Sequence, residues 1–174
     1  QVPTLTVDET NLAVNATADF SGNFSPVFGA DGAGSVGYTL NTGGGDSGLT
    51  DVATGQAVIL VKNGDVIEGH VGNVAGVIAF LASVDPATGV VTLDQQRALT
   101  HPNAANPDDA VSLAAGAVSV QAKVTDRDGD SVTANLNIGN ALSFKDDGPS
   151  FNLNNSQVPT LTVDETNLAV NATA

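Results

Sequence analysis

The first eighteen residues of the chain occur again, unchanged, at its end. Gln1 to Ala18 are identical to Gln157 to Ala174, so the sequence repeats from position 1 to position 157, an offset of 156 residues. An identical run of this length is typical of tandem repeats, in which each period is one folding unit. We therefore expect one complete module at residues 1–150, a linker between modules at 145–156, and the first strand of the next identical repeat at 157–174.

A period of this size is enough for one domain with its own hydrophobic core. The chain holds six Phe, one Tyr and no Trp or Met, so the core must be built mainly from Val, Leu, Ile and Ala. The β-branched members of this set favour strands. There is no Cys, which excludes disulfides and thiolate metal sites. No apolar run approaches the roughly 18 residues of a membrane span, so we expect no direct membrane insertion by these residues.

Alternation of apolar and polar residues is clearest late in the chain. Residues 118–124 and 131–138 both alternate with period two, which predicts two half-buried antiparallel strands joined across residues 126–130. The Asn63-Gly64 pair predicts a second hairpin. Further strands are expected at residues 3–7, 12–17, 36–40, 56–62, 66–71, 77–84, 90–93 and 111–114.

Many short strands separated by Gly, Pro and Asp turns predict an all-β fold, an immunoglobulin-like antiparallel β-sandwich. Because the unit exceeds the roughly 100 residues of a minimal domain of that kind, we expect inserted hairpins or long loops between residues 41 and 110. The Gly-rich residues 41–48 are expected to form a flexible loop, and residues 93–99 a helical turn. Residues 144–149 are assigned to the start of the linker.

Acidic residues outnumber basic ones by 19 to 5, which gives a formal net charge of −14. This charge argues against nucleic acid and anionic membranes as partners. The scattered Asp residues are equally well explained as a solvated surface that keeps the chain soluble. An Asp-rich protein with few cations also suggests that bound metal ions neutralise part of the charge.

One acidic cluster lies in the turn of the late hairpin. Asp126, Asp128 and Asp130 surround Gly129, and three carboxylates so close repel one another unless a cation lies between them. Calcium suits such a group because it accepts many oxygen ligands in flexible geometry. The turn is not an EF-hand loop, since Ser131 replaces its glycine and Asn137 its final glutamate. The alternative is a polar hairpin tip without a metal.

A second acidic group is expected at the other end of the module. The strand from residue 131 runs away from the hairpin turn, and the chain leaves the module at Asp146 and Asp147. Stacking modules head to tail would bring this pair against the hairpin turn of the next module. We expect Asp8 and Glu9, just after the first strand, to complete the group at the linker end. Their second copies, Asp164 and Glu165, belong to the following module.

Eight short segments occur in a distinctive order along the chain: Val7-Asp-Glu-Thr10, Gly29-Ala-Asp-Gly32, Ser47-Gly-Leu-Thr50, Ala53-Thr-Gly-Gln56, residues 85–93, residues 108–115, residues 124–130 and Phe144-Lys-Asp-Asp-Gly-Pro-Ser150. Together they resemble the tandem repeat of giant RTX adhesins that Gram-negative bacteria export by type I secretion. The resemblance implies an extracellular, immunoglobulin-like extender domain in a cell-surface protein. It also implies that Ca²⁺ holds adjacent identical repeats in a rod that projects a ligand-binding tip.

The sequence gives less support for other functions. His70 and His101 are the only histidines, and no nucleophile-elbow or zinc-protease motif is present, so we expect no enzyme. His101 precedes Pro102 and is interpreted as ending a strand or helix. The alternative function is an adhesive module that itself binds a glycan, ice or a host surface, although it lacks the aromatic residues or Thr ranks of such faces.

The second copy of the repeated segment is a strand without the rest of its domain. A lone strand exposes unpaired backbone groups. We therefore expect residues 157–174 to be ordered by pairing with a neighbouring molecule or by bracing the linker.

Overall fold

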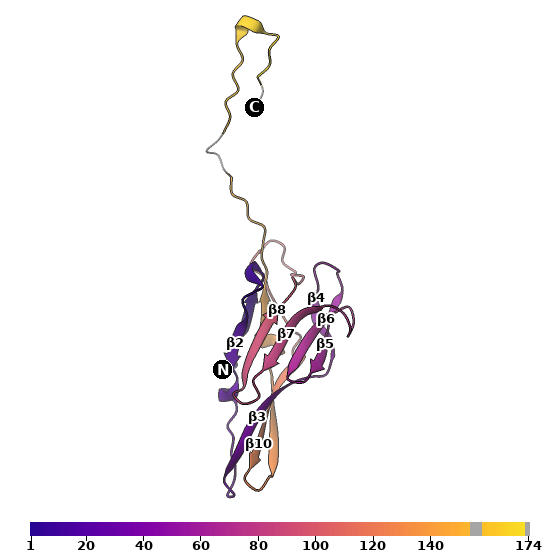
Figure 1. Ribbon diagram of the computed structural model, residues 1–174, viewed down its shortest axis with the longest axis vertical. Coiled ribbons are helices and arrows are strands. Elements are labelled where there is room, and N and C mark those ends of the chain that lie inside the picture. Colours follow the sequence, from indigo (N-terminus) through magenta and orange to yellow (C-terminus); the bar gives the residue numbers. More distant parts are fainter. Residues whose placement is uncertain (154–157, 173–174) are drawn as a thin grey trace.

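The computed structural model describes residues 1–153 and 158–172. These residues form twelve strands and four short 3-10 helices, and the strands make up three sheets (Figure 1). The strands are β1 (Leu5–Asp8), β2 (Ala16–Asp19), β3 (Ala33–Thr42), β4 (Gly45–Thr50), β5 (Ala57–Asn63), β6 (Val66–Val71), β7 (Ile78–Val84), β8 (Val90–Gln95), β9 (Ala110–Ser112), β10 (Val118–Asp126), β11 (Ser131–Asn137) and β12 (Leu142–Lys145). The 3-10 helices are η1 (Glu9–Asn11), η2 (Ser21–Asn23), η3 (Gly139–Ala141) and η4 (Glu165–Asn167).

The largest sheet has six antiparallel strands in the order β2-β8-β7-β6-β5-β4. A second sheet has the order β11-β10-β3, and a third has β1-β12-β9. Among the described residues, all strand pairs are antiparallel except β1 and β12, which run parallel with Leu5 beside Leu142. The expected all-β class with antiparallel sheets is confirmed. The expected insertion between residues 41 and 110 corresponds to β4 to β8, which form most of the six-stranded sheet.

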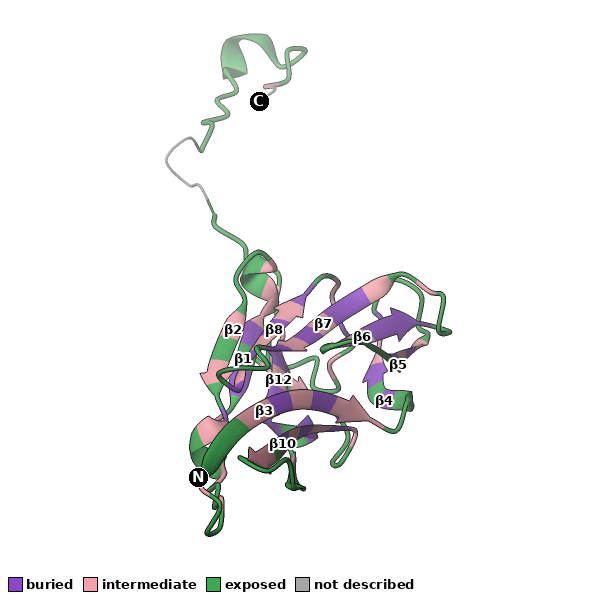
Figure 2. Cartoon of the chain, turned by 60° about the horizontal axis from the view of Figure 1, so that its bottom comes forward, coloured by how far each residue is buried: buried purple, intermediate pink, exposed green. Residues whose placement is uncertain are grey.

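The core lies between the sheets and consists of aliphatic side chains with three fully buried Phe residues. Phe80 of β7 packs against Phe144 of β12, with ring centroids 5.2 Å apart, and so joins two of the sheets. Gly69 lies against the Phe80 ring, where a Cβ would overlap ring carbons. Leu5 and Val7 bury the inward face of β1 in the same core (Figure 2). The N-terminal segment is therefore part of the module.

Three predictions about single segments were wrong. Residues 41–48 are not a flexible loop: β3 continues to Thr42, and β4 follows after a turn in which Gly44 and Gly45 take positive φ. Residues 93–99 form no helix, because β8 continues to Gln95 and Leu99 then bridges to Asp51. Phe144 does not begin the linker, since it is buried in β12 and the last strand of the module ends at Lys145.

The face of β11 also differs from the prediction. β11 pairs with β10 as expected, but Val132 and Ala134 are exposed and Leu136 is only partly buried. Their alternation predicted a half-buried strand. The reason is that β11 is the edge strand of its sheet. The end of this sheet near the β10–β11 turn has little of the module packed against it.

Residues 158–172 form no strand, and their side chains are exposed apart from Ala172. Among the described residues, the hydrogen bonds of this segment are local, around Asp164 and Asn167. Bracing of the linker is therefore not confirmed there, and pairing with a neighbouring molecule stays a prediction. Residues 157, 173 and 174 of the segment in this prediction lie outside the described part of the chain. Among the described residues there is no helix with the length and apolar character needed to cross a membrane.

Candidate functional site: two acidic groups at opposite ends of the module

The first acidic group lies at the tip of the β10–β11 hairpin. Carboxylate oxygens of Asp31, Asp126 and Asp128 all lie within 4.8 Å of one another. Asp130 belongs to the same turn, and we call these four residues the hairpin group. In Figure 1 the turn lies at the lower end of the module, and the chain leaves β12 at the upper end.

Backbone geometry builds the hairpin group. The Asp126 N–H donates to the Asp130 carbonyl at 3.0 Å, and the Gly129 N–H donates to Asp126 Oδ1 at 3.1 Å. Gly129 has φ 104°, a conformation that favours glycine. On the neighbouring strand, a Cβ on Gly34 would overlap the carbonyl oxygens of Thr125 and Asp126. Glycine at that position lets the turn that carries Asp31 approach the hairpin closely.

The carboxylates of the hairpin group repel one another. A shared hydrogen bond with Asp128, then partial desolvation and the charge of Asp128, raise the pKa of the Asp126 carboxyl. Hydrogen bonds from the Gly129 and Asp130 backbone oppose this increase. An acid with a raised pKa is held in surroundings that disfavour its charged form, and a bound cation would reverse that preference.

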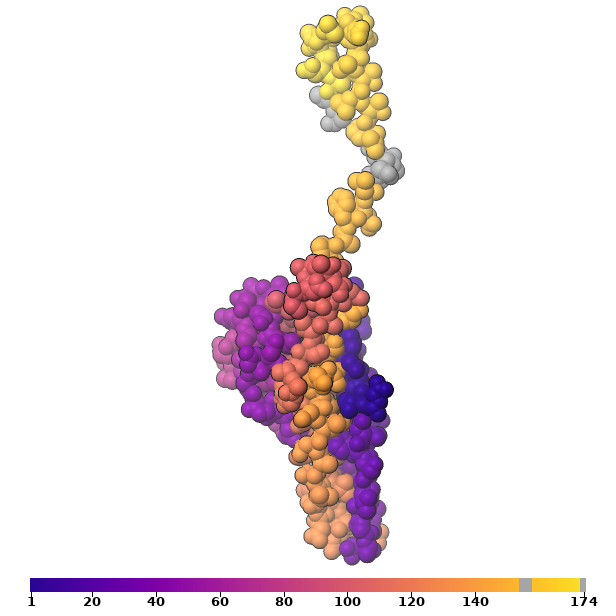
Figure 3. All heavy atoms as spheres, turned by 180° about the vertical axis from the view of Figure 1, so that it is seen from behind, coloured from indigo at the N-terminus to yellow at the C-terminus, as the bar shows by residue number. Residues whose placement is uncertain are grey.

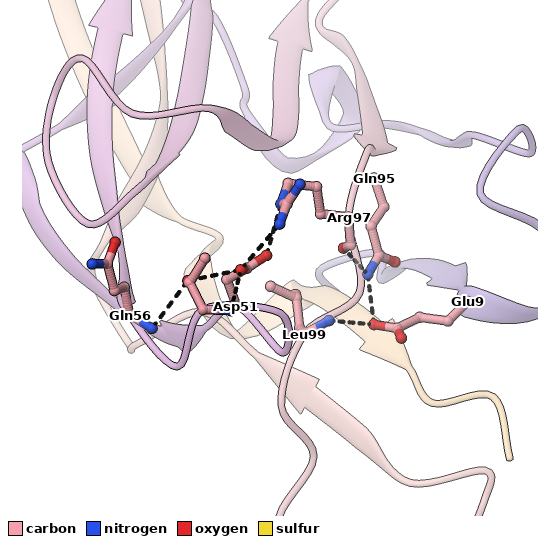
Figure 4. A network of polar contacts seen from close by, with 7 residues as sticks. Glu9, Asp51, Gln56, Gln95, Arg97 and Leu99 are labelled. Atoms are coloured by element: carbon pink, nitrogen blue, oxygen red, sulfur yellow. Dashed lines mark hydrogen bonds and ion pairs between the residues drawn. The ribbon is translucent and has the colours of Figure 1, made fainter.

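The second group lies where the chain leaves the module. Ligand atoms of Glu9, His101 and Asp146 lie within 4.8 Å of one another, and we call these residues the exit group. The Glu9 side chain is 7% exposed. Its Oε1 accepts from Gln95 Nε2 at 2.7 Å and from the Leu99 N–H at 2.8 Å (Figure 4). The same oxygen lies 3.4 Å from His101 Nε2.

An ion pair between partly exposed Arg97 and buried Asp51 supports this arrangement. Arg97 Nε donates to Asp51 Oδ1 at 2.7 Å, and its Nη2 donates to Oδ2 at 3.2 Å (Figure 4). Asp51 is fully buried and also accepts from Thr54. The hydrogen bond from Arg97 holds the pKa of the Asp51 carboxyl below its usual range, against the opposing effect of burial and with smaller help from Thr54 and from the charge of Arg97. The pair fixes the segment after β8, which presents the Leu99 N–H to Glu9.

The structure brings together some of the predicted site residues and separates others. Asp126 and Asp128 meet in one group with Asp130 in the same turn, and Glu9 meets Asp146 in the other. Asp147 is exposed beside Asp146, whose Oδ1 accepts its N–H at 3.0 Å. Asp8 does not join the exit group.

The Asp8 carboxylate has other partners. It accepts from the Thr10 N–H at 2.9 Å, which caps η1, and its Oδ2 lies 3.9 Å from Lys145 Nζ. Lys145 also pairs with Asp108. These contacts explain why Asp8 contributes to local structure beside the exit group while Glu9, the next residue, points into it.

Two residues near these groups were not predicted as site residues. Asp31 joins the hairpin group through the Gly29-Ala-Asp-Gly32 turn, which the sequence distinguishes only as one of the segments that resemble the adhesin repeat. His101 has a side chain that is 3% exposed, and its Nδ1 has no hydrogen-bond partner among the described residues. A single His before a Pro gives no signal of this packing, because its partner Glu9 is 92 residues away in the sequence.

The two groups differ in what they can bind. The hairpin group offers carboxylate oxygens in an open turn, which are the ligands that calcium prefers. In the exit group, Glu9 Oε1 already accepts internal hydrogen bonds and His101 is a nitrogen ligand, which calcium disfavours. The oxygen ligands best placed for a cation at that end are therefore Asp146 and Asp147.

Comparison with known proteins gives one match. No curated protein and no solved structure matches the chain significantly. The family described as "Domain of unknown function (DUF5801)" matches residues 4–139, from the start of β1 to the end of β11 and beyond. The match covers well over half of the sequence. The chain therefore belongs to this DUF5801 family.

Proposed function

We propose that the chain is a structural extender module of a large bacterial surface adhesin. In this proposal identical modules are stacked in tandem, and calcium at the joints makes the array rigid so that it projects a distal ligand-binding region. The identical segments at residues 1–18 and 157–174 support the tandem arrangement. The resemblance to RTX adhesin repeats supports the adhesin identity, export by type I secretion and a location on the surface of a Gram-negative cell.

The observation that carries the proposal is the placement of acidic groups at the two ends of one module. The hairpin group lies at one end, and Asp146 and Asp147 lie where the chain leaves the other end (Figure 1). In a head-to-tail array, the exit of one module faces the hairpin group of the next. Calcium takes about six to eight oxygen ligands. Carboxylates from both ends can share one ion, because the hairpin turn is open and Asp147 is exposed.

Calcium would act by removing repulsion at the joint. The raised pKa of Asp126, caused first by its hydrogen bond with Asp128, reflects carboxylates that are held close together. In the proposal Asp126, Asp128 and Asp31 hold the ion from one side, and Asp146 and Asp147 hold it from the other. The ion would supply positive charge and oxygen coordination, and the ordered joint would bend less.

Small-angle scattering on a protein of two units tests the proposal. With calcium we expect a larger maximum dimension and a higher melting temperature than with a chelator, because the bound ion ties the exit of one unit to the hairpin group of the next. Asp128→Asn should weaken both responses. Asp65→Asn, which removes an exposed carboxylate from the β5–β6 turn, is the matched control and should leave both unchanged.

The same data separate the proposal from its alternative. Equal maximum dimension and equal melting temperature with calcium and with chelator would overturn the calcium joint. A module that binds a glycan, ice or a host surface need not change its length with calcium, so that result would favour a direct adhesive role.

A further inference from the structure

The end of the module that carries the hairpin group also has an open apolar groove. One wall is the lower part of the sheet β11-β10-β3, where Val132, Val124 and Val36 lie side by side in register. The other wall is the segment 24–27 that precedes β3. The groove continues from Phe24 past Val27 to Asp126 and Asp130 of the hairpin tip. Figure 3 shows this end from behind, with the segment before β3 in violet beside β10 and β11 in orange.

The groove is apolar and uncovered. Val27 is 81% exposed and Val132 is 64% exposed. The alternation of residues 131–138 is typical of a strand with one buried face, yet this part of the face has no cover among the described residues. Such a sequence pattern on an open surface indicates that another segment covers it in the assembled protein.

The start of the chain lies at the entrance of the groove. Asn23 Nδ2 donates to the Gln1 carbonyl at 3.3 Å, and the next residue, Phe24, is the first to line the groove. In a tandem array, the residues before Gln1 are a copy of the linker that ends at Ser156. The linker of the preceding unit therefore arrives beside Phe24.

The linker has the reach to lie along the groove. Leu153 and Phe151 precede Gln157 by four and six residues, a span of about 13 and 20 Å in an extended chain. Phe24 packs against Tyr38, which pairs with Ala122, and the hairpin tip begins four residues later at Asp126. The four residues from Ala122 to Asp126 span about 13 Å along β10. Because the extended spans are upper limits, the linker is long enough for Phe151 and Leu153 to lie along the apolar part and for Asp147 to reach the hairpin group.

The linker also has the matching chemistry. Phe151 and Leu153 are 87% and 75% exposed in this chain, and with polar Asn152 between them they lie on one face of an extended segment. The order along the linker, acidic then apolar, follows the order along the groove from its acidic tip to its apolar entrance. We propose that the linker of each unit lies in the groove of the next, with Phe151 and Leu153 packed against Val27, Val124 and Val132.

This inference rests on the tandem arrangement of the proposed function, but its test needs neither calcium nor a rod. The protein is the 174-residue chain preceded by one copy of its own residues 146–156, compared with the same chain without that addition, both in chelator. We expect the added linker to raise the melting temperature by several degrees. We also expect it to shift the methyl resonances of Val27, Val124 and Val132.

Two matched variants define the contact. Phe151→Ser with Leu153→Ser in the added copy should abolish both effects, and the same pair of changes in the chain's own residues 151 and 153 should leave them intact. Val132→Ser should remove the stabilisation by the added linker while leaving the chain without it nearly unchanged, because Val132 is exposed there.

The outcomes separate the two proposals. No rise in melting temperature and no methyl shift would overturn the docking, even if a two-unit protein still lengthens with calcium. A clear shift without any calcium response would support the docking and contradict the calcium joint. Methyl shifts that depend on protein concentration but not on the added linker would overturn the docking and identify a second module face as the occupant.

Discussion

The two copies of the eighteen-residue segment have the same side chains and very different surroundings. In the first copy, Leu5 and Val7 are 1% and 3% exposed in β1. In the second copy, their counterparts Leu161 and Val163 are 58% and 69% exposed, and no strand forms among the described residues there. Because the covalent structure is identical, the difference comes only from the presence of partners.

One feature does persist in both copies. η1 and η4 form at the same place in each, and in each the preceding Asp accepts a hydrogen bond from the Thr two residues later. The comparison therefore separates structure that a short sequence specifies alone from structure that needs β12 and the core. Four experiments test this comparison of the two copies, in decreasing order of expected effect.

Deletion of the first copy should destabilise the module strongly, and deletion of the second copy should have almost no effect on its stability. Removing residues 1–18 removes β1 and three of the four residues of β2, so we expect loss of the cooperative unfolding transition in urea. Removing residues 157–174 should change the free energy of unfolding by less than about 0.5 kcal/mol, because the segment makes no described contact with the module. If the first deletion is tolerated only while the C-terminal copy is present, the second copy has taken the place of β1.

The same leucine can be shortened in each copy. Leu5→Ala should cost about 2–5 kcal/mol of unfolding free energy, because it leaves a cavity beside β12. Leu161→Ala should be neutral within about 0.5 kcal/mol. Chemical denaturation of both variants measures the contrast. A loss well below 1 kcal/mol for Leu5→Ala would mean that β1 opens locally before the module unfolds.

The acidic residue after each strand gives a smaller contrast. Glu9→Ala removes the acceptor of the Leu99 N–H and of the Gln95 side chain, so we expect a loss of about 1–3 kcal/mol. Glu165→Ala should have no measurable effect on unfolding, since Glu165 is exposed. Equal effects of the two substitutions would show that the hydrogen bonds to Glu9 do not stabilise the module.

The smallest effect concerns the two capping aspartates. Hydrogen bonds from the Thr10 side chain and backbone lower the pKa of the Asp8 carboxyl, and the charge of Lys145 lowers it further. Hydrogen bonds from Thr166 lower the pKa of Asp164 in the same way. In a carboxyl-detected NMR titration, both should titrate below the usual Asp range. Lys145→Met should raise the pKa of Asp8 and leave that of Asp164 unchanged.

The effect on stability has the same sign for Asp8 and Asp164, but it acts on different parts of the chain. A folded-state pKa below the unfolded value gives stability that is present above the unfolded pKa and is lost as the pH falls through the folded pKa. For Asp8 this loss acts on the whole module, whereas for Asp164 it acts only on a local turn. Melting temperatures in acid should therefore fall less for Asp8→Asn than for the unmodified chain, with no difference for Asp164→Asn.

Most strands could be predicted because their pattern is local. The β10–β11 and β5–β6 hairpins follow from alternation and from turn residues such as Asn63-Gly64. β4 was not predicted, since Gly45, Asp46 and Gly48 have low strand propensity and its pairing with β5 is irregular. β12 was not predicted either, because its short apolar stretch is followed at once by linker residues.

The residues of the candidate site also divide into those that a local pattern brings together and those that only the fold brings together. Asp126, Asp128 and Asp130 occupy one turn, so the sequence places them together. Glu9, His101 and Asp146 come from three distant segments, and Asp31 comes from another turn. Their proximity depends on strand pairing that no local pattern encodes. The exposure of Val132 could not be predicted from the sequence either. An alternating pattern indicates that one face of a strand is suited to burial, but it does not show which segment covers that face.

By itself the sequence determined the repeat period, the acidic charge, the hairpin turns and the capped 3-10 turn that forms in both copies. Each depends on composition or on hydrogen bonds between residues a few positions apart. The tertiary structure decided that residues 5–8 are a strand, that Glu9 is buried beside His101, and that the groove of Val27 and Val132 is open. A strand needs partners for its backbone N–H and C=O groups and a core for its side chains, and only the folded module supplies both.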